Sequence, residues 1–429
     1  MTEEIQPIRG MNDVLPADIG AWQHLEAVTR ELLTSYGYEE IRVPLLERTE
    51  LFKRAIGEHT DVVGKEMYTF TDRGGDSLTL RPEATAGIVR ALVSNRMLRG
   101  QRHKLWCLGP MFRHEAPQAG RYRQFWQVDV EAVGCPGPDV DAELIALSAR
   151  LWERLGLKGL KLEINSLGTA ESRREYRARL IEYFGAHEAR LDADSRRRLG
   201  GNPLRILDSK NPEMQELIAG APLLTEHLDA ESRQHFEALR AMLEGAGVAY
   251  AINPRLVRGL DYYNRTVFEW ITASTGAQNA VCSGGRYDGL IAQLGGEATP
   301  AVGFAMGVER LVALLVAAGG PPPAAHPDVY VVVSGARATA EALSIVERLR
   351  SERPRLRFEL NLGGGNFKAQ FRRADKSGAP LALIIGDDEL ARGVLGVKPL
   401  RMESGQSECP VDALAAGIDA ALRGLGGAR

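Results

Sequence analysis

A proline-rich stretch, "GGPPPAAHP" at residues 319–327, divides this chain of 429 residues into two regions with different sequence patterns. Proline stiffens a chain and is typical of spacers between folded domains. The length agrees with such a division, since a chain of this size suggests two to three domains of about 150 residues each. We therefore predict one domain over residues 1–325 and a second domain over residues 326–429.

The region before the proline-rich stretch carries strand patterns with helical segments between them. Four segments between residues 67 and 134 are typical of strands: "MYTFTD", "SLTLRP", "KLWCLGPMF" and "FWQVDVEAVG". The segment "TAGIVRALVSNRML" lies among them and is typical of a helix. This mixture predicts an α+β domain in which helices pack on an antiparallel sheet. Residues 171–247 are rich in Arg, Glu, Leu and Ala, and they predict a helical insertion in that domain.

The region after the proline-rich stretch alternates between strand and helix. The segments "DVYVVVSG", "RFELNL" and "PLALIIG" are typical of strands, and helical segments separate them. This order predicts a small α/β domain with a largely parallel sheet. One of its helical segments carries Lys368, Arg372 and Lys376 at intervals of four residues, apart from an apolar face that begins at Phe367. Such a basic stripe is either a solvated surface or a track for a phosphate backbone.

The composition argues against several classes of protein. A net charge of -3 indicates that any nucleic-acid surface is local rather than global. The N-terminus, "MTEEIQPIRG", lacks the apolar segment of a signal peptide, and no run of about 18 apolar residues exists. We therefore expect a cytoplasmic protein without a membrane span. Neither a metal site nor a disulfide framework is expected, because no CxxC pair occurs among the four cysteines, Cys107, Cys135, Cys282 and Cys409.

The loop between the last two of those strands, "RHEAPQAGRYRQF" at residues 113–125, concentrates positive charge. It is longer than the two to five residues usual in a hairpin, and long loops on rigid strands often carry function. Its arginines, Arg113, Arg121 and Arg123, offer forked donors that suit phosphate oxygens. A solvated surface loop is the structural alternative. Between Arg96 and Phe125, however, seven Lys and Arg residues stand against a single acid.

The strand that follows this loop has one polar face and one core face. Alternation places four residues on the polar face: Phe125, Gln127, Asp129 and Glu131. A ring, an amide and two carboxylates would suit a purine and a small polar substrate. An outer strand with one solvated face is the alternative.

Four further segments carry candidate residues. In "SLTLRPEATAG" (77–87), Glu83 and Thr85 enter a helix, where such residues are also ordinary caps. In "LVRGLDYY" (256–263), Arg258 lies in an apolar stretch and needs an anionic partner, which is either a substrate or a structural salt bridge. The two tyrosines that follow are expected on opposite faces of a strand. The paired glycines of "SGGRYDGLI" (283–291) would allow close approach of a ligand, or would form a plain turn. In "PAVGFAMGVERL" (300–311), Arg310 lies in the first turn of a helix, which favours bound anions.

Together these segments resemble the bacterial histidyl-tRNA synthetases along nearly the whole chain. "YGYEEIRVPLLE", "GPMFRHEAPQAGRYRQF" and "PAVGFAMGVERL" are similar to motifs 1, 2 and 3 of the class II aminoacyl-tRNA synthetases. "LVRGLDYY" and "SGGRYDGL" are similar to the two segments specific to the histidine enzymes. The resemblance implies a class II catalytic domain with the helical insertion, and a C-terminal α/β anticodon-binding domain.

The resemblance also implies an activity. A histidine–tRNA ligase uses ATP with Mg²⁺ to convert L-histidine to histidyl-adenylate, and then forms histidyl-tRNA(His), AMP and diphosphate. It needs no permanently bound cofactor and no protein nucleophile. Motif 1 lies at a two-fold interface in this family, so the resemblance implies a homodimer.

The resemblance assigns roles to individual residues. It implies that Arg258 and Arg113 are catalytic. The ATP site would contain Arg113, Glu115, Arg121, Phe125 and Arg310. The histidine site would contain Glu83, Thr85, Arg113, Gln127, Glu131, Arg258, Tyr262, Tyr263 and Tyr287. Contacts with tRNA would come from Gln118, Arg123, Lys368, Arg372 and Lys376.

Two departures from the family pattern and three alternatives accompany this interpretation. The family usually carries basic residues where this chain has Ala116 and Ala119, at the tip of the motif 2 loop. This difference bears on recognition of the tRNA acceptor end rather than on adenylation. The main alternative is a non-catalytic, synthetase-like regulatory subunit of ATP phosphoribosyltransferase. Such proteins generally lack the C-terminal domain and lose catalytic arginines. A synthetase for another amino acid and a pure tRNA-binding module are the other two.

Overall fold

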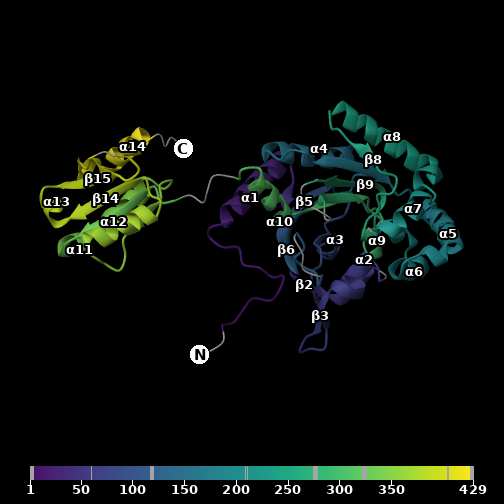
Figure 1. Cartoon of the computed structure of the whole chain (residues 1–429). Coiled ribbons are helices and arrows are strands. Elements are labelled where there is room, and N and C mark those ends of the chain that lie inside the picture. Colours follow the sequence, from purple (N-terminus) through teal and green to yellow (C-terminus); the bar gives the residue numbers. More distant parts are fainter. Residues whose placement is uncertain are drawn as a thin grey trace. The chain divides into compact units, whose positions relative to one another are not determined.

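The chain folds into two compact units, Met1–Pro323 and Ala324–Arg429 (Figure 1). Each unit has its own sheet and its own hydrophobic core. The computed structural model describes residues 4–58, 60–115, 120–207, 209, 211–273, 279–320, 326–402 and 405–425.

The first unit is built on an eight-stranded sheet. Its order is β1 (Glu39–Glu40), β5 (His103–Phe112), β6 (Gln124–Val133), β11 (Ala301–Gly307), β10 (Ala280–Arg286), β9 (Asn264–Ile271), β7 (Lys161–Ser166) and β8 (Ala251–Ile252). All ladders from β5 to β7 are antiparallel, and the two outermost strands pair in parallel. The predicted antiparallel sheet is therefore confirmed for the central strands. A smaller antiparallel sheet contains β2 (Leu46–Arg48), β4 (Ser77–Leu80) and β3 (Tyr68–Thr71).

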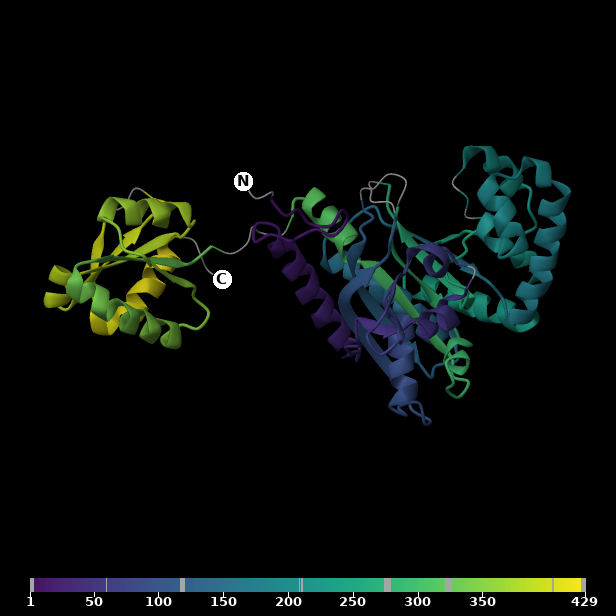
Figure 2. The ribbon, with the colours of Figure 1, turned by 90° about the horizontal axis from the view of Figure 1, so that it is seen from below.

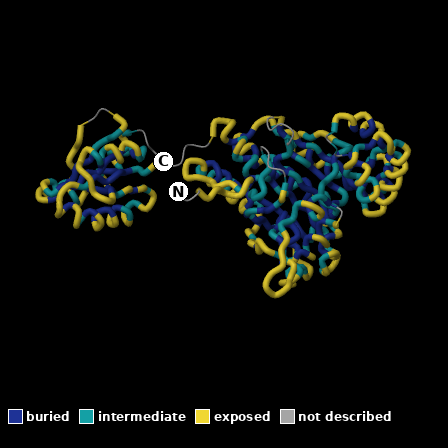
Figure 3. Tube along the Cα trace, turned by 60° about the horizontal axis from the view of Figure 1, so that its bottom comes forward, coloured by how far each residue is buried: buried dark blue, intermediate teal, exposed yellow. Residues whose placement is uncertain are grey.

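Helices cover both faces of the large sheet. One face packs against α1 (Ile19–Ser35), α4 (Pro138–Arg154) and α10 (Val308–Ala317), while the other packs against α2 (Thr49–Ile56), α3 (Thr85–Ser94) and α9 (Leu290–Gln293). The predicted alternation along β6 decides which side chains go where. Val128 and Val130 are wholly buried on the α4 side, whereas Phe125 packs on the α2 and α3 side. Figure 3 shows how the buried backbone concentrates in the interior of each unit.

Residues for which a helical insertion was predicted do form helices. These are α5 (Ala170–Ala186), α6 (Ala193–Gly200), α7 (Gln215–Ala219) and α8 (Ala230–Gly245). Three of them begin with side-chain caps, at Thr169, Asp192 and Asp229, each accepting a hydrogen bond from the N–H three residues later. Figures 1 and 2 show α5, α6 and α7 in teal as a lobe at one end of the large sheet.

The second unit is a five-stranded sheet with helices on it. Its order is β13 (Phe358–Leu360), β12 (Val329–Ser334), β14 (Leu381–Gly386), β15 (Val394–Pro399) and β16 (Ser407–Pro410). Its helices are α11 (Ala336–Glu352), α12 (Phe367–Lys376), α13 (Asp387–Ala391) and α14 (Leu414–Gly424).

The expectation of a largely parallel sheet holds for half of this unit. The β12 ladders with β13 and β14 are parallel, but β14–β15 and β15–β16 are antiparallel. The reason is the length of the connections after β14. A parallel crossover needs a dozen or more residues, and residues 387–393 and 400–406 are too few.

Helix α12 carries the predicted basic stripe, and its predicted apolar face packs on the sheet at Phe371 and Ala374 but not at Phe367. Phe367 is 46% exposed, and its ring contacts Phe371 with the centroids 4.7 Å apart. The buried positions are Gln370 and Ala374. Gln370 occupies the inward position because its amide accepts from the N–H of Val333 at 2.8 Å and donates to the carbonyl of the same residue at 2.6 Å.

Candidate active site

A cavity of about 960 Å³ opens on the polar face of β6 in the first unit. Side chains reach it from the start of α3, the loop after β5, the segment before β9, and the start of α10. Thirteen predicted site residues line it: Glu83, Thr85, Arg113, Glu115, Arg121, Phe125, Gln127, Glu131, Arg258, Tyr262, Tyr263, Tyr287 and Arg310. Segments far apart in the sequence meet here because the strand order places β6, β11, β10 and β9 side by side.

Glu131 is a wholly buried carboxyl group at the centre of the cavity wall. Its Oε1 accepts a hydrogen bond from the hydroxyl of Thr85 at 2.6 Å, and its Oε2 accepts one from the hydroxyl of Tyr287. Burial raises the pKa of Glu131 to about 8. On the neighbouring strand β11, any Cβ at Gly303 would collide with this carboxyl group, so only glycine fits there.

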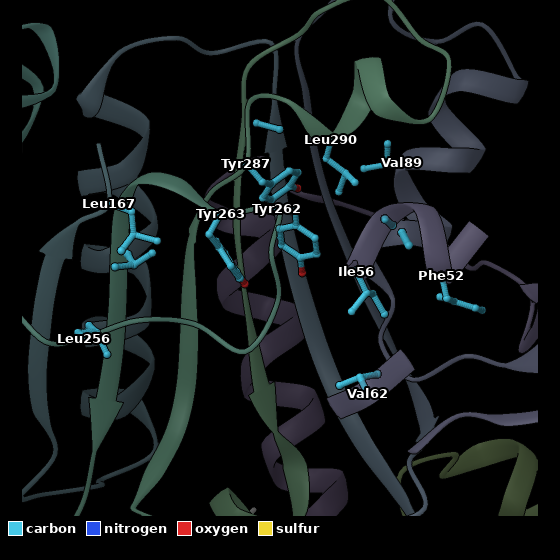
Figure 4. Close-up of a cluster of buried hydrophobic side chains, with 14 of the residues drawn as sticks. Phe52, Ile56, Val62, Val89, Leu167, Leu256, Tyr262, Tyr263, Tyr287 and Leu290 are labelled. Atoms are coloured by element: carbon cyan, nitrogen blue, oxygen red, sulfur yellow. The ribbon is translucent and has the colours of Figure 1, made fainter. Parts of the chain in front are cut away.

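Tyr262 and Tyr263 were expected on opposite faces of a strand, but their side chains lie together. They lie in the turn before β9, which begins at Asn264, so strand alternation does not apply to them. Both side chains are buried, with ring centroids 4.6 Å apart, and Tyr262 also contacts Tyr287 edge to face at 5.6 Å. Figure 4 shows the three rings together, above the side chains of α2. They form an aromatic wall of the cavity.

Glu83 fills both roles that the sequence left open. Its Oε1 accepts the N–H of Ala86 at 2.8 Å, so it caps α3. Its Oε2 accepts a hydrogen bond from the hydroxyl of Tyr262 at 3.4 Å, so the same carboxyl group also faces the cavity. Burial raises the pKa of Glu83, because the charged form loses its hydration.

Arg258 lies on the cavity wall in an ion pair. Its Nη1 donates to Oε2 of Glu269 at 2.5 Å, and its guanidinium carbon lies 5.7 Å from the ring centroid of Tyr263. Glu269 also accepts a hydrogen bond from Ser283 at 3.1 Å. Glu269 was not among the predicted site residues, although a lone acid inside the apolar strand "NRTVFEWI" is a signal that could have indicated it. Arg258 therefore forms a salt bridge, which was the structural alternative to a substrate contact, and it does so beside the cavity.

Arg113 and Arg121 reach the cavity from the long loop. The Nε of Arg113 donates to the carbonyl of Pro82 at 2.9 Å, and its guanidinium carbon lies 5.3 Å from the ring centroid of Phe125. The Nε of Arg121 lies 3.0 Å from Oε2 of Glu115.

Arg310 reaches the same part of the cavity from the first turn of α10. It donates to the carbonyl of Gly120 at 3.0 Å and to that of Ala280 at 2.5 Å. Burial and the neighbouring charge of Arg121 lower its pKa. The three arginines thus form a strongly cationic region at one side of the cavity, where an anion would lower their mutual repulsion.

Known families match both units. The sequence pattern of the histidyl-tRNA synthetases matches residues 10–311, and that of an anticodon binding domain matches residues 328–420. The chain belongs to the histidyl-tRNA synthetase family. The apo histidyl-tRNA synthetase of S. aureus is 35% identical, with a TM-score of 0.81, over 97% of this chain and 100% of that one.

More distant structures share the fold. A histidyl-tRNA synthetase from Nostoc sp. PCC 7120 is 21% identical, with a TM-score of 0.68, over 98% of this chain and 100% of that one. A Bacillus halodurans protein described as an ATP phosphoribosyltransferase regulatory subunit/histidyl-tRNA synthetase is 23% identical, with a TM-score of 0.65, over 90% of this chain and 99% of that one.

Membership of the histidyl-tRNA synthetase family establishes the reaction. The protein is a class II histidine–tRNA ligase that uses ATP to activate L-histidine and transfers it to tRNA(His). The anticodon-binding unit and the match to the S. aureus enzyme over nearly the full length support the ligase over the regulatory subunit. In the part of the chain that the structure describes, no helix has the length and apolar character of a membrane span.

The structure describes four of the five residues predicted to contact tRNA. Arg123 donates to the backbone carbonyl of Glu115 at 3.4 Å. Gln118 lies outside the described residues, as do Ala116 and Ala119. The other three, Lys368, Arg372 and Lys376, are exposed on α12 of the second unit.

Two further acids line the cavity but were not among the residues assigned to ATP or histidine. Glu309, in the first turn of α10, accepts the N–H of Trp126 with both oxygens, at 2.9 and 3.0 Å. It thereby joins the motif 3 helix to the motif 2 strand, and burial raises its pKa to about 7. Asp129 lines the cavity between Gln127 and Glu131. The alternation along β6 had already placed it on the polar face.

Proposed function

We propose that histidyl-adenylate forms in this cavity and that the lining residues divide between ATP and histidine. The observation that supports this proposal is the convergence of Arg113, Arg258 and Arg310 on the cavity that also contains Glu131 and Tyr263. Three guanidinium groups suit the charge of a triphosphate. A carboxylate and a phenol in the same cavity suit the two nitrogens of an imidazole ring.

ATP occupies the side of the cavity that carries the loop arginines. Phe125 stacks on the adenine, Arg310 covers its other face, and Glu115 accepts from its amino group. Arg121 exchanges its present partner, Glu115, for the outer phosphates. Arg113 holds the α-phosphate. Stacking and charge-assisted hydrogen bonds of this kind position the nucleotide without any covalent step.

Histidine occupies the buried side of the cavity. Glu131 and Tyr263 bind its two ring nitrogens, and the hydrogen bonds from Thr85 and Tyr287 hold the Glu131 carboxyl group in place. Tyr262 and Tyr287 supply the apolar wall. Glu83, Thr85 and Gln127 bind the α-ammonium group. Side chains that lack either nitrogen leave a buried polar group without a partner, which is the physical basis for rejecting them.

The chemical step joins two anions. A carboxylate oxygen of histidine attacks the α-phosphorus, and the bond to the diphosphate leaving group breaks. The nucleophile is already ionised, so no general base is needed. Arg258 and Arg113 lower the repulsion between the anions and stabilise the charge that develops on the phosphoryl oxygens. Arg258 turns from Glu269 toward the substrate in this step.

Mg²⁺ enters with ATP as part of the substrate. Within the described residues, no group of three or more His, Cys, Asp or Glu side chains is arranged to hold a metal ion. This fits an ion that phosphate oxygens and water hold for the most part, as is usual for Mg²⁺ with nucleotides. Its charge supplies further neutralisation of the phosphates.

The test is ATP–pyrophosphate exchange with each of the standard amino acids in turn. Histidine alone should support exchange, and Arg258→Ala should lower kcat/KM at least about 100-fold, the usual cost of losing a transition-state interaction. Arg54→Ala, which removes an exposed arginine of α2, should leave exchange unchanged. Exchange that persists in Arg258→Ala, or that another amino acid supports equally well, contradicts the assignment.

A homodimer through the motif 1 region belongs to the same proposal. The small sheet of β2, β3 and β4, with the residue before β2, exposes three large apolar side chains, Leu45, Leu46 and Phe70, by 42%, 41% and 46%. An apolar patch of this kind is typical of a surface that a second copy covers. The double variant Leu46→Glu, Phe70→Glu should sediment as a monomer. A monomeric native protein at micromolar concentration would contradict the dimer.

The remaining parts of the proposal concern tRNA and location. Gln118 and Arg123 of the long loop meet the acceptor end, and Lys368, Arg372 and Lys376 follow the backbone near the anticodon. The catalytic domain spans residues 1–325 and the anticodon-binding domain residues 326–429. The protein works in the cytoplasm, where its tRNA is charged.

A further inference from the structure

The polar face of β6 carries buried acceptors without donors. Asp129 is 1% exposed, and neither of its carboxylate oxygens has a hydrogen-bond partner among the residues that the structure describes. Oε1 of Gln127, two residues earlier on the same face, is likewise buried and unpaired within the described part of the chain. Both side chains line the cavity. Glu131, the next residue on this face, differs because both of its oxygens are bonded.

The neighbouring strands keep the side chain of Asp129 out of bulk solvent. It lies in the middle of the large sheet, opposite Cys107 of β5 and Ala305 of β11. Burial, and then the charge of Glu83, raises the pKa of Asp129 to about 8. A buried carboxyl group with no hydrogen bond is costly and is normally found only where something binds it.

The arginines near Asp129 donate hydrogen bonds to backbone carbonyl groups instead. Arg81 attracts Asp129 electrostatically, but its Nε donates to the carbonyl of Pro110 at 3.0 Å and its Nη1 to that of Val43 at 3.1 Å. Arg113 lowers the pKa of Asp129 through its charge, and the backbone N–H of Ala84 lowers it as a weak donor whose geometry falls short of a hydrogen bond. None of these groups makes a hydrogen bond to its oxygens. The vacant acceptors therefore face the cavity.

A small cation with several N–H donors would satisfy these acceptors. Residues two apart on a strand lie about 7 Å apart, so one tetrahedral ammonium group between them can reach both side chains. Resting on the proposed function, which brings histidine into this cavity, we propose that Asp129 is a further specificity residue, whose carboxylate accepts from the α-ammonium group of the amino acid beside Gln127. Asp129 thereby helps to select an α-amino acid over other imidazole carboxylates.

The competing explanation is structural: Asp129 balances the charge of the buried Arg81. The two explanations differ in what happens when the ligand has no ammonium group. The probe is 3-(imidazol-4-yl)propionate, which keeps the imidazole and the carboxylate of histidine. Dissociation constants of L-histidine and of this analogue are measured by calorimetry, or as inhibition constants of exchange where binding is weak, for the native protein and for Asp129→Asn.

We expect Asp129→Asn to weaken histidine binding roughly 10- to 100-fold, the range for removing a hydrogen bond to a charged group. Binding of the analogue should change less than about threefold. In exchange, the KM for histidine should rise while kcat stays within about threefold, because the ammonium interaction is the same in ground and transition states. An equal weakening for both ligands, or no weakening for histidine, overturns the proposal.

A matched control separates an effect on stability from an effect on ligand recognition. Asp141 of α4 is another wholly buried carboxylate, which Arg286 of β10 and His235 of α8 hold, and it does not line the cavity. Asp141→Asn should lower the thermal midpoint and change the two affinities in parallel, unlike Asp129→Asn. If the native protein fails to bind histidine, the proposed function fails with this inference. If it binds histidine and only the ligand-selective effect is missing, the inference alone fails.

Discussion

At the scale of single residues, the histidine side of the cavity depends on an absent side chain. Gly303 leaves room for the carboxyl group of Glu131, and a methyl group there would strike both that group and the backbone of Val130. Gly303→Ala should therefore displace Glu131 and weaken histidine binding more than about 10-fold, with a decrease in stability of about 1–3 kcal/mol. Calorimetry with histidine and with ATP separately would measure this.

The same substitution should spare ATP, because its proposed contacts come from other elements. Gly289→Ala is the matched control, since its Cβ would meet no atom within 4 Å. Equal weakening of ATP and histidine binding in Gly303→Ala would point to a general collapse of the sheet instead.

Single positions are predictable where a regular element fixes them. Alternation along β6 is enough to place Phe125, Gln127 and Glu131 on the cavity face. Alternation failed for Tyr262 and Tyr263, because a turn rather than a strand positions them. Whether a buried oxygen has a hydrogen-bond donor depends on all of its neighbours in the fold. The sequence therefore placed Asp129 on the polar face of β6 but could not show that its oxygens are unpaired.

At the scale of elements, Glu309 fastens α10 to β6. Its carboxylate accepts the N–H of Trp126, so Glu309→Ala should leave that donor buried without a partner and cost about 1–3 kcal/mol. Glu309→Gln keeps an acceptor and should cost less. Chemical denaturation of both variants at pH 6 would measure the difference.

The raised pKa of Glu309 adds a pH dependence. The folded state holds this proton up to about pH 7, whereas the unfolded state releases it near the ordinary value of 4.5. Between these values the folded state binds more protons, so the contribution of Glu309 to stability falls as the pH rises. Glu309→Gln should flatten that part of the native curve. A variant whose stability keeps the native slope from pH 5 to pH 7 contradicts the raised pKa.

The order of the strands within the sheet was less predictable than the positions of strands and helices along the chain. The strands predicted between residues 67 and 134 and the helices predicted within residues 171–247 do form. Nothing in the periodicity, however, says that β6 pairs with β11 rather than with its sequence neighbour β7, and that pairing brings Arg310 to Arg113. The resemblance to a known family implied that both arginines belong to the ATP site, but it did not give the strand pairing that brings them there. In the second unit, the short connections after β14 carried the information that the strand patterns lacked.

At the scale of the whole molecule, adenylation and tRNA binding should be separable by substitution. The two units have separate cores, and the basic stripe Lys368, Arg372 and Lys376 belongs to the second alone. The triple alanine variant of the full chain should leave ATP–pyrophosphate exchange unchanged and raise the KM for tRNA in charging. The expected rise in KM is on the order of 10-fold at physiological salt. Each basic side chain that neutralises a phosphate releases counterions, and the variant loses that favourable contribution.

A charge-matched triple variant makes this prediction specific. Arg337, Arg348 and Arg392 are exposed in the same unit and are paired with acids, so replacing all three by alanine changes the net charge equally. If α12 tracks the tRNA backbone, only the stripe variant should flatten the dependence of the tRNA KM on salt, by a slope of about 0.7–0.9 for each phosphate that is no longer neutralised. If both variants weaken charging alike, the attraction comes from the overall charge of the unit and not from the stripe.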